Sequence, residues 1–119
     1  MTQAQNSKQY DLEKRCLEFA RNVRFFIKGL SRTIGNIEDG KQLIRSSGSV
    51  GANYIEANES LSKKDFVMRA KICRKEAKES IYWLKLIDVD TKNEKQRVVL
   101  EDEVTQLMKI FGSIIEKCK

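Results

Sequence analysis

The stretch FVMRAKICRKEAKESIYWLKLI, residues 66–87, decides the fold of this chain. Apolar and small residues recur in it at alternating steps of four and three, at Phe66, Ala70, Cys73, Ala77, Ser80, Leu84 and Ile87. Spacing of this kind places one stripe along one side of a helix. Its mean period of about 3.5 residues favours helices that pack almost parallel to one another.

The same rhythm occurs three more times along the chain. One copy lies on Leu12, Cys16, Phe19, Val23, Phe26 and Leu30, another on Leu100, Val104, Leu107, Phe111, Ile114 and Cys118, and a weaker one on Leu43, Ser47, Val50, Tyr54, Ala57 and Leu61. The pattern predicts helices over about residues 11–30, 37–58, 63–87 and 92–118. Because short loops join antiparallel neighbours, the predicted fold is an all-α, up-down-up-down four-helix bundle.

Local capping signals predict where three of these helices begin. Asn36, with acidic residues at 38 and 39, is typical of an N-cap followed by acids that meet the positive helix end. Ser62 and Asp65 resemble a capping box, and TKNE, residues 91–94, matches the full pattern. We therefore expect Asn36, Ser62 and Thr91 to cap the last three helices.

Length and composition indicate one helical domain. The chain has 119 residues, 40% hydrophobic and 34% charged, and no proline to interrupt a helix. We expect a disordered N-terminal tail over residues 1–9 and a bundle domain over residues 10–119. There is no run of 18 apolar residues and no signal-peptide segment at the polar N-terminus, so we expect a cytoplasmic protein without a membrane span.

The residues that usually carry catalysis are scarce. Histidine, the commonest general base, is absent, and Cys16, Cys73 and Cys118 all fall on apolar stripes. Small reduced core residues are the simplest interpretation of these cysteines, since metal ligation would need two or more close together. We expect no catalytic residue, no metal and no cofactor, and a protein that is not an enzyme.

Two pairs of carboxylates are candidates for a metal site. Glu56 and Glu59 are near neighbours on the second predicted helix, and Glu76 and Glu79 on the third. Facing pairs of this kind can bind two metals, but the known pattern requires Glu-x-x-His, which this chain cannot supply. A local ion pair between Lys75 and Glu79 is the alternative.

The middle of the second predicted helix, SSGSVGAN at residues 46–53, is made of poor helix formers. Each glycine costs about 1 kcal/mol relative to alanine in a helix, so something must offset it. Close approach of two helix backbones is the favoured interpretation. The alternative, a glycine-rich phosphate cradle, lacks the preceding strand and the following Lys-Ser/Thr that it needs.

The third predicted helix carries a second apolar arc beside its core stripe. Met68, Ile72, Trp83 and Leu86 form this arc, with Glu79 among them. A helix in a monomeric bundle needs only one apolar face, so the arc predicts an interface with another copy of the chain. The alternative is a wide core arc with scattered exposed apolar residues.

The first and third predicted helices hold the excess of positive charge. Residues 8–32 carry seven basic and three acidic residues, and residues 63–85 carry eight and three. Such faces attract phosphate backbones without reading sequence. The candidate nucleic-acid contacts are Arg15, Arg21, Arg24, Lys28, Lys64, Lys71, Arg74, Lys75, Lys78 and Lys85. A solvated helix face is the alternative, and with Tyr82 as the only aromatic among the lysines, base recognition is expected to be poor.

Four segments of the chain also resemble a known family. SVGANYIEA at residues 49–57, SKKDF at 62–66, RKEAKES at 74–80 and YWL at 82–84 are similar to the bacterial four-helix bundle proteins, also called 23S rRNA intervening-sequence proteins. The resemblance is close over residues 42–87. By motif match the positions of interest are Ser49, Asn53, Glu56 and Glu79, expected first to be hydrogen-bonding groups between helices.

The resemblance implies a left-handed bundle that assembles as a ring, typically a pentamer. Some family members are encoded within insertions in ribosomal RNA genes, and a related group serves as accessory proteins of retroelement reverse transcriptases. The family brings no catalytic residues with it. Three functions stay open: an oligomer that binds RNA or DNA through basic helices, a scaffold ring that docks a partner protein such as a reverse transcriptase, and a bundle that binds a small ligand or metal.

Overall fold

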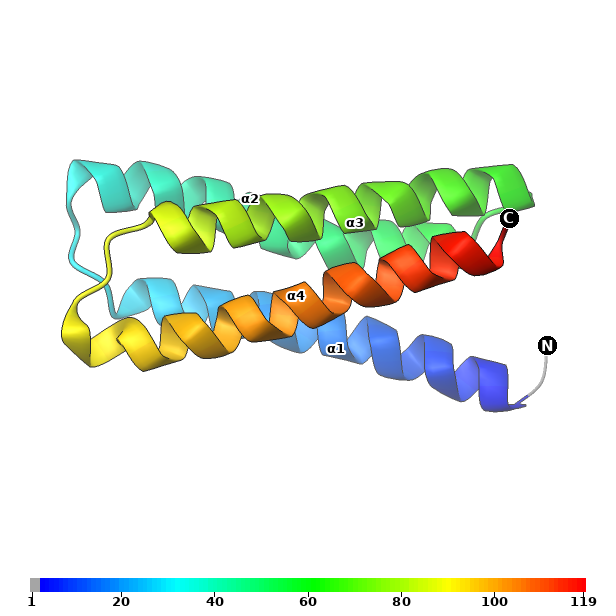
Figure 1. Ribbon diagram of the computed structural model, residues 1–119, viewed down its shortest axis with the longest axis horizontal. Coiled ribbons are helices and arrows are strands. Elements are labelled where there is room, and N and C mark those ends of the chain that lie inside the picture. The colour runs from blue at the N-terminus through cyan, green and yellow to red at the C-terminus, as the bar shows by residue number, and fades with distance from the viewer. Residues whose placement is uncertain (1–2) are drawn as a thin grey trace.

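Each of the four apolar stripes lies on a long helix in the computed structural model, which describes residues 3–119 and, of their side chains, those of residues 11–119. The helices are α1 (Gln3–Lys28), α2 (Ile34–Asn58), α3 (Lys63–Leu86) and α4 (Glu94–Lys117), and one 3₁₀ turn, η1 (Thr91–Asn93), precedes α4. Consecutive helices run antiparallel, and they form an elongated body of 46 × 23 × 19 Å (Figure 1). The predicted all-α, up-down-up-down four-helix bundle is therefore confirmed, and its left-handed sense stays a prediction.

The order of packing around the bundle puts α1 and α3 on a diagonal. The closest pairs are α2 with α3 and α3 with α4, followed by α1 with α2, while α1 and α4 meet less extensively. Figure 1 shows α1 and α3 at opposite corners, each between the other two helices. The expected tail over residues 1–9 overlaps α1, whose backbone begins at Gln3, and residues 1–2 lie outside the described part of the chain.

The stripes meet along the axis of the bundle and form one core. All four helices contribute buried side chains to it. They include Cys16, Phe19, Val23 and Phe26 from α1, Leu43, Val50 and Tyr54 from α2, Cys73, Ala77 and Leu84 from α3, and Leu100, Val104, Leu107 and Phe111 from α4. Leu61 was expected to continue the second stripe, and that was wrong. It lies in the loop after α2 and is fully exposed, because the helix ends at Asn58.

The predicted cap of α3 is correct and that of α2 is not. Ser62 Oγ accepts a hydrogen bond from the Asp65 amide at 3.1 Å, as expected of an N-cap. Thr33 caps α2 instead of Asn36, and its Oγ1 accepts from the Asn36 amide at 3.1 Å. Asn36 lies inside the first turn and is buried, where its amide side chain bonds the loop after α3.

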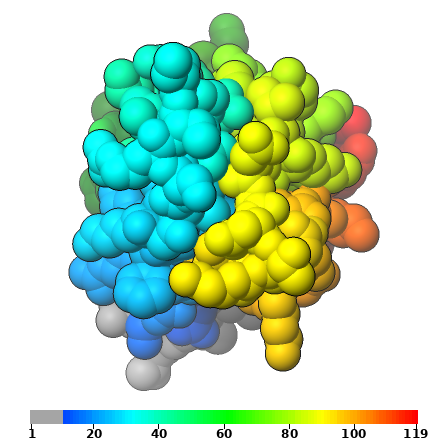
Figure 2. Space-filling model, turned by 90° about the vertical axis from the view of Figure 1, so that its left-hand side faces the viewer, coloured from blue at the N-terminus to red at the C-terminus, as the bar shows by residue number. Residues whose placement is uncertain are grey.

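Two asparagines join the loops at one end of the bundle. The Asn36 side chain donates to the carbonyls of Ser31 and Asp88 at 3.0 and 3.1 Å and accepts from the Asp88 amide at 3.0 Å. Asn93 donates to the Gly29 carbonyl at 3.2 Å. Figure 2 looks at this end and shows the α1–α2 loop beside the α3–α4 loop.

The predicted capping box at residues 91–94 is also wrong. Those residues form η1, which Asp90 caps by accepting from the amide of Asn93 at 3.2 Å, and α4 begins only at Glu94. The side chain of Asn93 is committed to Asp90 and Gly29. The tertiary bond to Gly29, just after α1, therefore takes precedence over the local pattern.

Close approach of α1 and α2 explains the small residues of α2. A Cβ on Gly51 would lie 3.1 Å from Cys16 Cβ, which is tighter than ordinary van der Waals contact. A Cβ on Gly40 would lie 3.5 Å from Ile27. The favoured interpretation of this segment is therefore confirmed, since the backbones come near where α2 carries glycine.

We predict opposite effects of substitutions at two glycines of α2. Gly51→Val should lower the free energy of unfolding by about 2 kcal/mol, because its methyl groups collide with α1. Gly48→Ala, whose Cβ would lie 3.8 Å from the flexible end of Arg24, should raise it by about 0.5–1 kcal/mol through helix propensity. Urea denaturation followed by circular dichroism measures both. A Gly51→Val protein as stable as the parent would contradict the close approach.

Candidate functional site

Five lysines form a ridge along the outer face of α3. Lys64, Lys71, Lys75, Lys78 and Lys85 are all exposed and point away from the core, and we call them the lysine ridge. At 1.5 Å per residue the ridge is about 32 Å long. Within the side chains that the structure describes, none of the five comes within ion-pair distance of a carboxylate. Arg74 borders the ridge on the side of α4, where it lies near Gly112.

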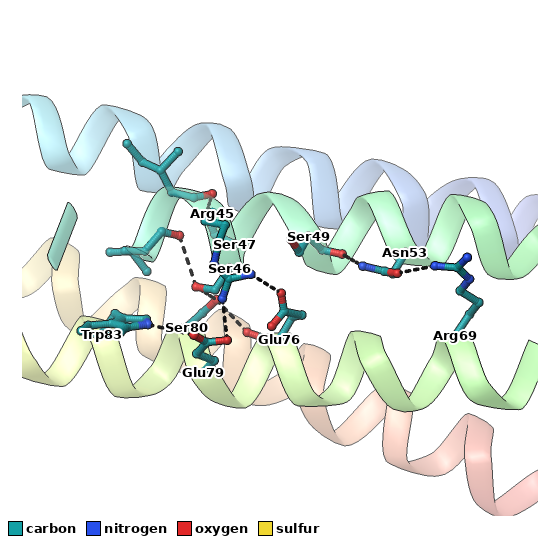
Figure 3. A network of polar contacts seen from close by, with 12 residues as sticks. Arg45, Ser46, Ser47, Ser49, Asn53, Arg69, Glu76, Glu79, Ser80 and Trp83 are labelled. Carbon is teal, nitrogen blue, oxygen red and sulfur yellow. Dashed lines mark hydrogen bonds and ion pairs between the residues drawn. The ribbon is translucent and has the colours of Figure 1, made fainter. Parts of the chain in front are cut away.

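The two nearby carboxylates of α3 face α2 instead of the ridge. Arg45 of α2 donates from Nη1 to Glu76 at 2.8 Å and from Nη2 to Glu79 at 2.7 Å (Figure 3). The alternative Lys75–Glu79 pair is not formed. Arg45 thus holds both acids toward α2, and the lysines occupy the neighbouring outer face of α3.

The pKa values of this cluster follow from its hydrogen bonds. The bond from Arg45 lowers the pKa of the Glu79 carboxyl below its usual range, against the opposing effect of burial. The bonds to Glu79 and Glu76 raise the pKa of Arg45. One guanidinium serves two carboxylates, so the cluster carries one net negative charge when all three groups are ionised.

Small polar residues continue this seam between α2 and α3. Ser80 Oγ donates to Ser46 Oγ at 2.9 Å in a fully buried bond, and the two oxygens bring the helices close (Figure 3). Further along, Arg69 of α3 donates to Asn53 Oδ1 at 3.1 Å. Polar contacts therefore link α2 to α3 at three successive levels.

The four positions found by motif match do not share one role. Asn53 and Glu79 make the hydrogen bonds between helices that were expected of them. Ser49 takes part through its carbonyl, which accepts from Asn53 Nδ2 at 2.9 Å within α2. The side chain of Glu56 is exposed, and its carbonyl accepts the local bond from Ser60.

The second apolar arc of α3 lies along this same seam. Met68 and Leu86 are 51% and 49% exposed. Ile72 and Trp83 are half-buried, and Trp83 packs against the core. The arc is therefore neither fully inside the protomer nor fully outside it.

The basic residues of α1 divide into two groups. Arg15 belongs to the bundle itself, since it bonds Glu103 at 2.8 Å through two nitrogens and Gln106 at 2.7 Å, and the bond to Glu103 raises its pKa. Arg21, Arg24 and Lys28 are exposed on the outer face of α1, and Arg21 and Arg24 lie on the side of this face toward α2. Because α1 and α3 are diagonal, this face and the lysine ridge point in opposite directions and do not form one surface in a protomer.

Two surface features were not found from the sequence. Phe25 of α1 is 72% exposed. A groove of about 410 Å³ runs between α1 and α2 where Gly48, Gly51 and Ala52 leave space, with Leu17 and Ile55 on its sides. The small residues were the signal for the groove, because a helix contact made on glycine leaves a hollow beside it.

Cys16 and Cys73 are buried core residues, whereas Cys118 is half-buried at the end of α4. Burial raises the pKa of the Cys16 and Cys73 thiols to about 12, so both are protonated at neutral pH. Among the side chains described, no three histidine, cysteine, aspartate or glutamate residues converge on a metal position. None of the helices described is long and apolar enough to cross a membrane.

The fold and its surface place the chain in the class of small all-α bundles with a basic outer face. Comparison with family models makes this specific: the model of the 23S rRNA-intervening sequence protein matches residues 8–113, and the chain belongs to that family. Among solved structures, it is similar to a protein of unknown function from the S23 ribosomal protein family of Bacteroides thetaiotaomicron. That likeness has 30% identity and a TM-score of 0.77, over 92% of this chain and 98% of that one. No protein with a curated description matches the chain.

The Arg45 cluster predicts a specific acid sensitivity. Since the folded pKa of Glu79 is lowered, its ion pair stabilises the protein above the ordinary glutamate pKa, and this stability is lost as pH falls through the lowered value. Between about pH 6 and about pH 3 the free energy of unfolding should fall less in Glu79→Gln than in the parent. Urea denaturation at each pH measures it, with Glu59→Gln as control, since Glu59 is an exposed acid that forms no ion pair with the side chains of residues 11–119. Parallel curves for Glu79→Gln and the parent would contradict the assignment.

Proposed function

We propose that this protein is a non-enzymatic nucleic-acid-binding bundle that contacts phosphates through the lysine ridge of α3. The observation that carries the proposal is the segregation of charge on that helix. Five exposed lysines lie on one face, and none of them is within ion-pair distance of a carboxylate of residues 11–119, while Arg45 holds Glu76 and Glu79 on another face. Lysines that are free of internal partners can each neutralise a phosphate and release its counterion.

The electrostatics of the whole chain support the same function. Its formal net charge is +6, so the ridge attracts a polyanion before contact is made. Arg21, Arg24 and Lys28 of α1 supply a second, separate basic face on the opposite side. Arg15 is excluded from the proposed contacts because its guanidinium is bound to Glu103 and Gln106.

Removal of ridge charges should reduce both affinity and its dependence on salt. The triple variant Lys71→Gln, Lys78→Gln, Lys85→Gln should bind single-stranded RNA more weakly, and the slope of log affinity against log salt should fall by about 2. The control is Lys95→Gln, Lys109→Gln, Lys117→Gln, which removes the same charge from exposed positions of α4. Fluorescence anisotropy at several salt concentrations measures both triples.

Two results would contradict the proposed function. One is an equal loss in both triple variants, which would mean that net charge alone matters. The other is no binding by the parent protein even at low salt. In that case the scaffold function, in which the bundle docks a partner protein without nucleic acid, would take its place.

We also propose that copies of the chain associate through the apolar arc of α3. Met68 and Leu86 leave about half of their surface in water, and they lie on the same side of α3 as Ile72, Trp83 and Glu79. Apolar side chains grouped along one seam are typical of a protein interface. The pentameric ring is the assembly that the family resemblance implies.

A charge in the arc should break this association. The double variant Met68→Glu, Leu86→Glu should lower the molecular mass measured by light scattering and leave helicity unchanged. These two positions test the arc better than Trp83, because Trp83 also packs against the core. The control is Val98→Glu, Val99→Glu on α4, where both valines are also exposed. An unchanged mass in the arc variant would contradict the interface.

A further inference from the structure

Tyr82 is an exposed aromatic ring at the edge of the lysine ridge. It is 58% exposed, and Lys78 and Lys85 lie one helical turn before and after it on the same face of α3. The ring therefore stands between two cations that are free to hold phosphates on either side of it.

The neighbouring side chains hold this ring in one orientation. Trp83 meets Tyr82 edge to face, with ring centroids 5.0 Å apart and planes at 80°. The Trp83 indole donates from Nε1 to Glu79 at 3.4 Å, and Glu79 is bound by Arg45 at 2.7 Å. A contact path thus runs from the α2–α3 seam to the surface, and it supports the ring before any ligand arrives.

We infer that Tyr82 is a stacking platform for an unpaired base, so that the lysine ridge binds single-stranded nucleic acid in preference to duplex. The inference rests on the proposed function of the ridge. A base with a free face stacks on an aromatic side chain, whereas the bases of a duplex are already stacked on one another. Lys78 and Lys85 hold the phosphates on either side of that base.

The chemistry of the site predicts that it does not distinguish one base from another. Stacking tolerates every base, because each has a π-face, and lysine contacts to phosphate carry no sequence information. Tyr82 is the exposed aromatic ring on this face of α3, and the α3 residues one turn before and after it carry no side-chain amide. Binding to single strands is therefore expected without base specificity, in agreement with the poor base recognition expected from the sequence.

Phe25 of α1 provides a matched comparison. It is more exposed than Tyr82 and also lies one turn from basic residues, Arg21 and Lys28. Among the side chains described, however, no second aromatic ring packs against it. It stands on the opposite side of the protomer, so its removal should leave the lysine ridge intact.

The test compares a fluorescein-labelled oligouridylate of about 12 nucleotides with an RNA duplex of similar length, by anisotropy at low salt. The parent should bind the single strand more tightly than the duplex. Tyr82→Ala should weaken single-strand binding at least about fivefold, with little change in duplex binding or in the salt slope. Tyr82→Phe and Phe25→Ala should bind like the parent. Because Trp83 is the only tryptophan, binding of the single strand should also change its emission.

The outcomes separate this inference from the function on which it rests. If the parent binds neither RNA, the proposed function fails and the inference with it. If the parent binds both RNAs and Tyr82→Ala binds the single strand as well as the parent does, phosphate binding by the lysine ridge is supported. The role of Tyr82 as a stacking platform is then contradicted. A Tyr82→Ala protein with a lower mass in light scattering would also overturn it, because Tyr82 would then belong to the interface between copies.

Discussion

The ion-pair cluster of Arg45 with Glu76 and Glu79 is the constraint on which the rest of this structure depends. Glu76 is almost completely buried, and a buried carboxylate destabilises a fold unless it is paired and hydrogen-bonded. Arg45 reaches it from α2 at 2.8 Å and takes Glu79 at the same time. Together with the buried bond between Ser46 and Ser80, this leaves α3 one rotational setting against α2.

That setting decides what α3 presents to solvent. Because successive residues of a helix turn by a fixed angle, holding Glu76 and Glu79 against α2 places the lysine ridge on the outside. The same setting places the apolar arc beside the α2–α3 seam. Tyr82 then lies where the lysine ridge borders the arc. The proposed binding face and the proposed interface between copies are therefore consequences of one polar contact and do not need separate explanations.

The architecture could be predicted from the sequence because it depends on periodicity, a property that many residues share. The helix starts depend on single residues, and two of the three expected caps were wrong. Asn36 and the segment at 91–94 have the composition of caps, but the neighbouring loops offered the amide side chains of Asn36 and Asn93 partners that a sequence does not display. Ser62 was predicted correctly because it lies in an exposed turn, and within residues 11–119 its hydroxyl has the Asp65 amide as its partner.

The candidate site could be predicted where it depends on periodicity along one helix, and not where it depends on contacts between helices. The lysine ridge follows from spacing along one helix, and the structure places all five lysines outside. Arg45 pairs with Glu79, a residue 34 positions away in the sequence. Sequence spacing can predict partners only one helical turn apart, and it therefore favoured Lys75 as the partner of Glu79. The ion pair between Arg15 and Glu103 could not be predicted either, since the two residues are 88 positions apart in the sequence. The opposition of the two basic faces was not predicted either, although alternate helices of an up-down bundle are diagonal.

The most direct test of the central claim is a double-mutant cycle between α2 and α3. The free energies of unfolding of Arg45→Met, Glu76→Gln and the double variant would be measured by urea denaturation at neutral pH. If Arg45 and Glu76 fix the setting of α3, each single change should destabilise the protein, and the two should be coupled by more than about 1 kcal/mol. Effects that add to within about 0.3–0.5 kcal/mol would contradict the account, because the two residues would then act independently.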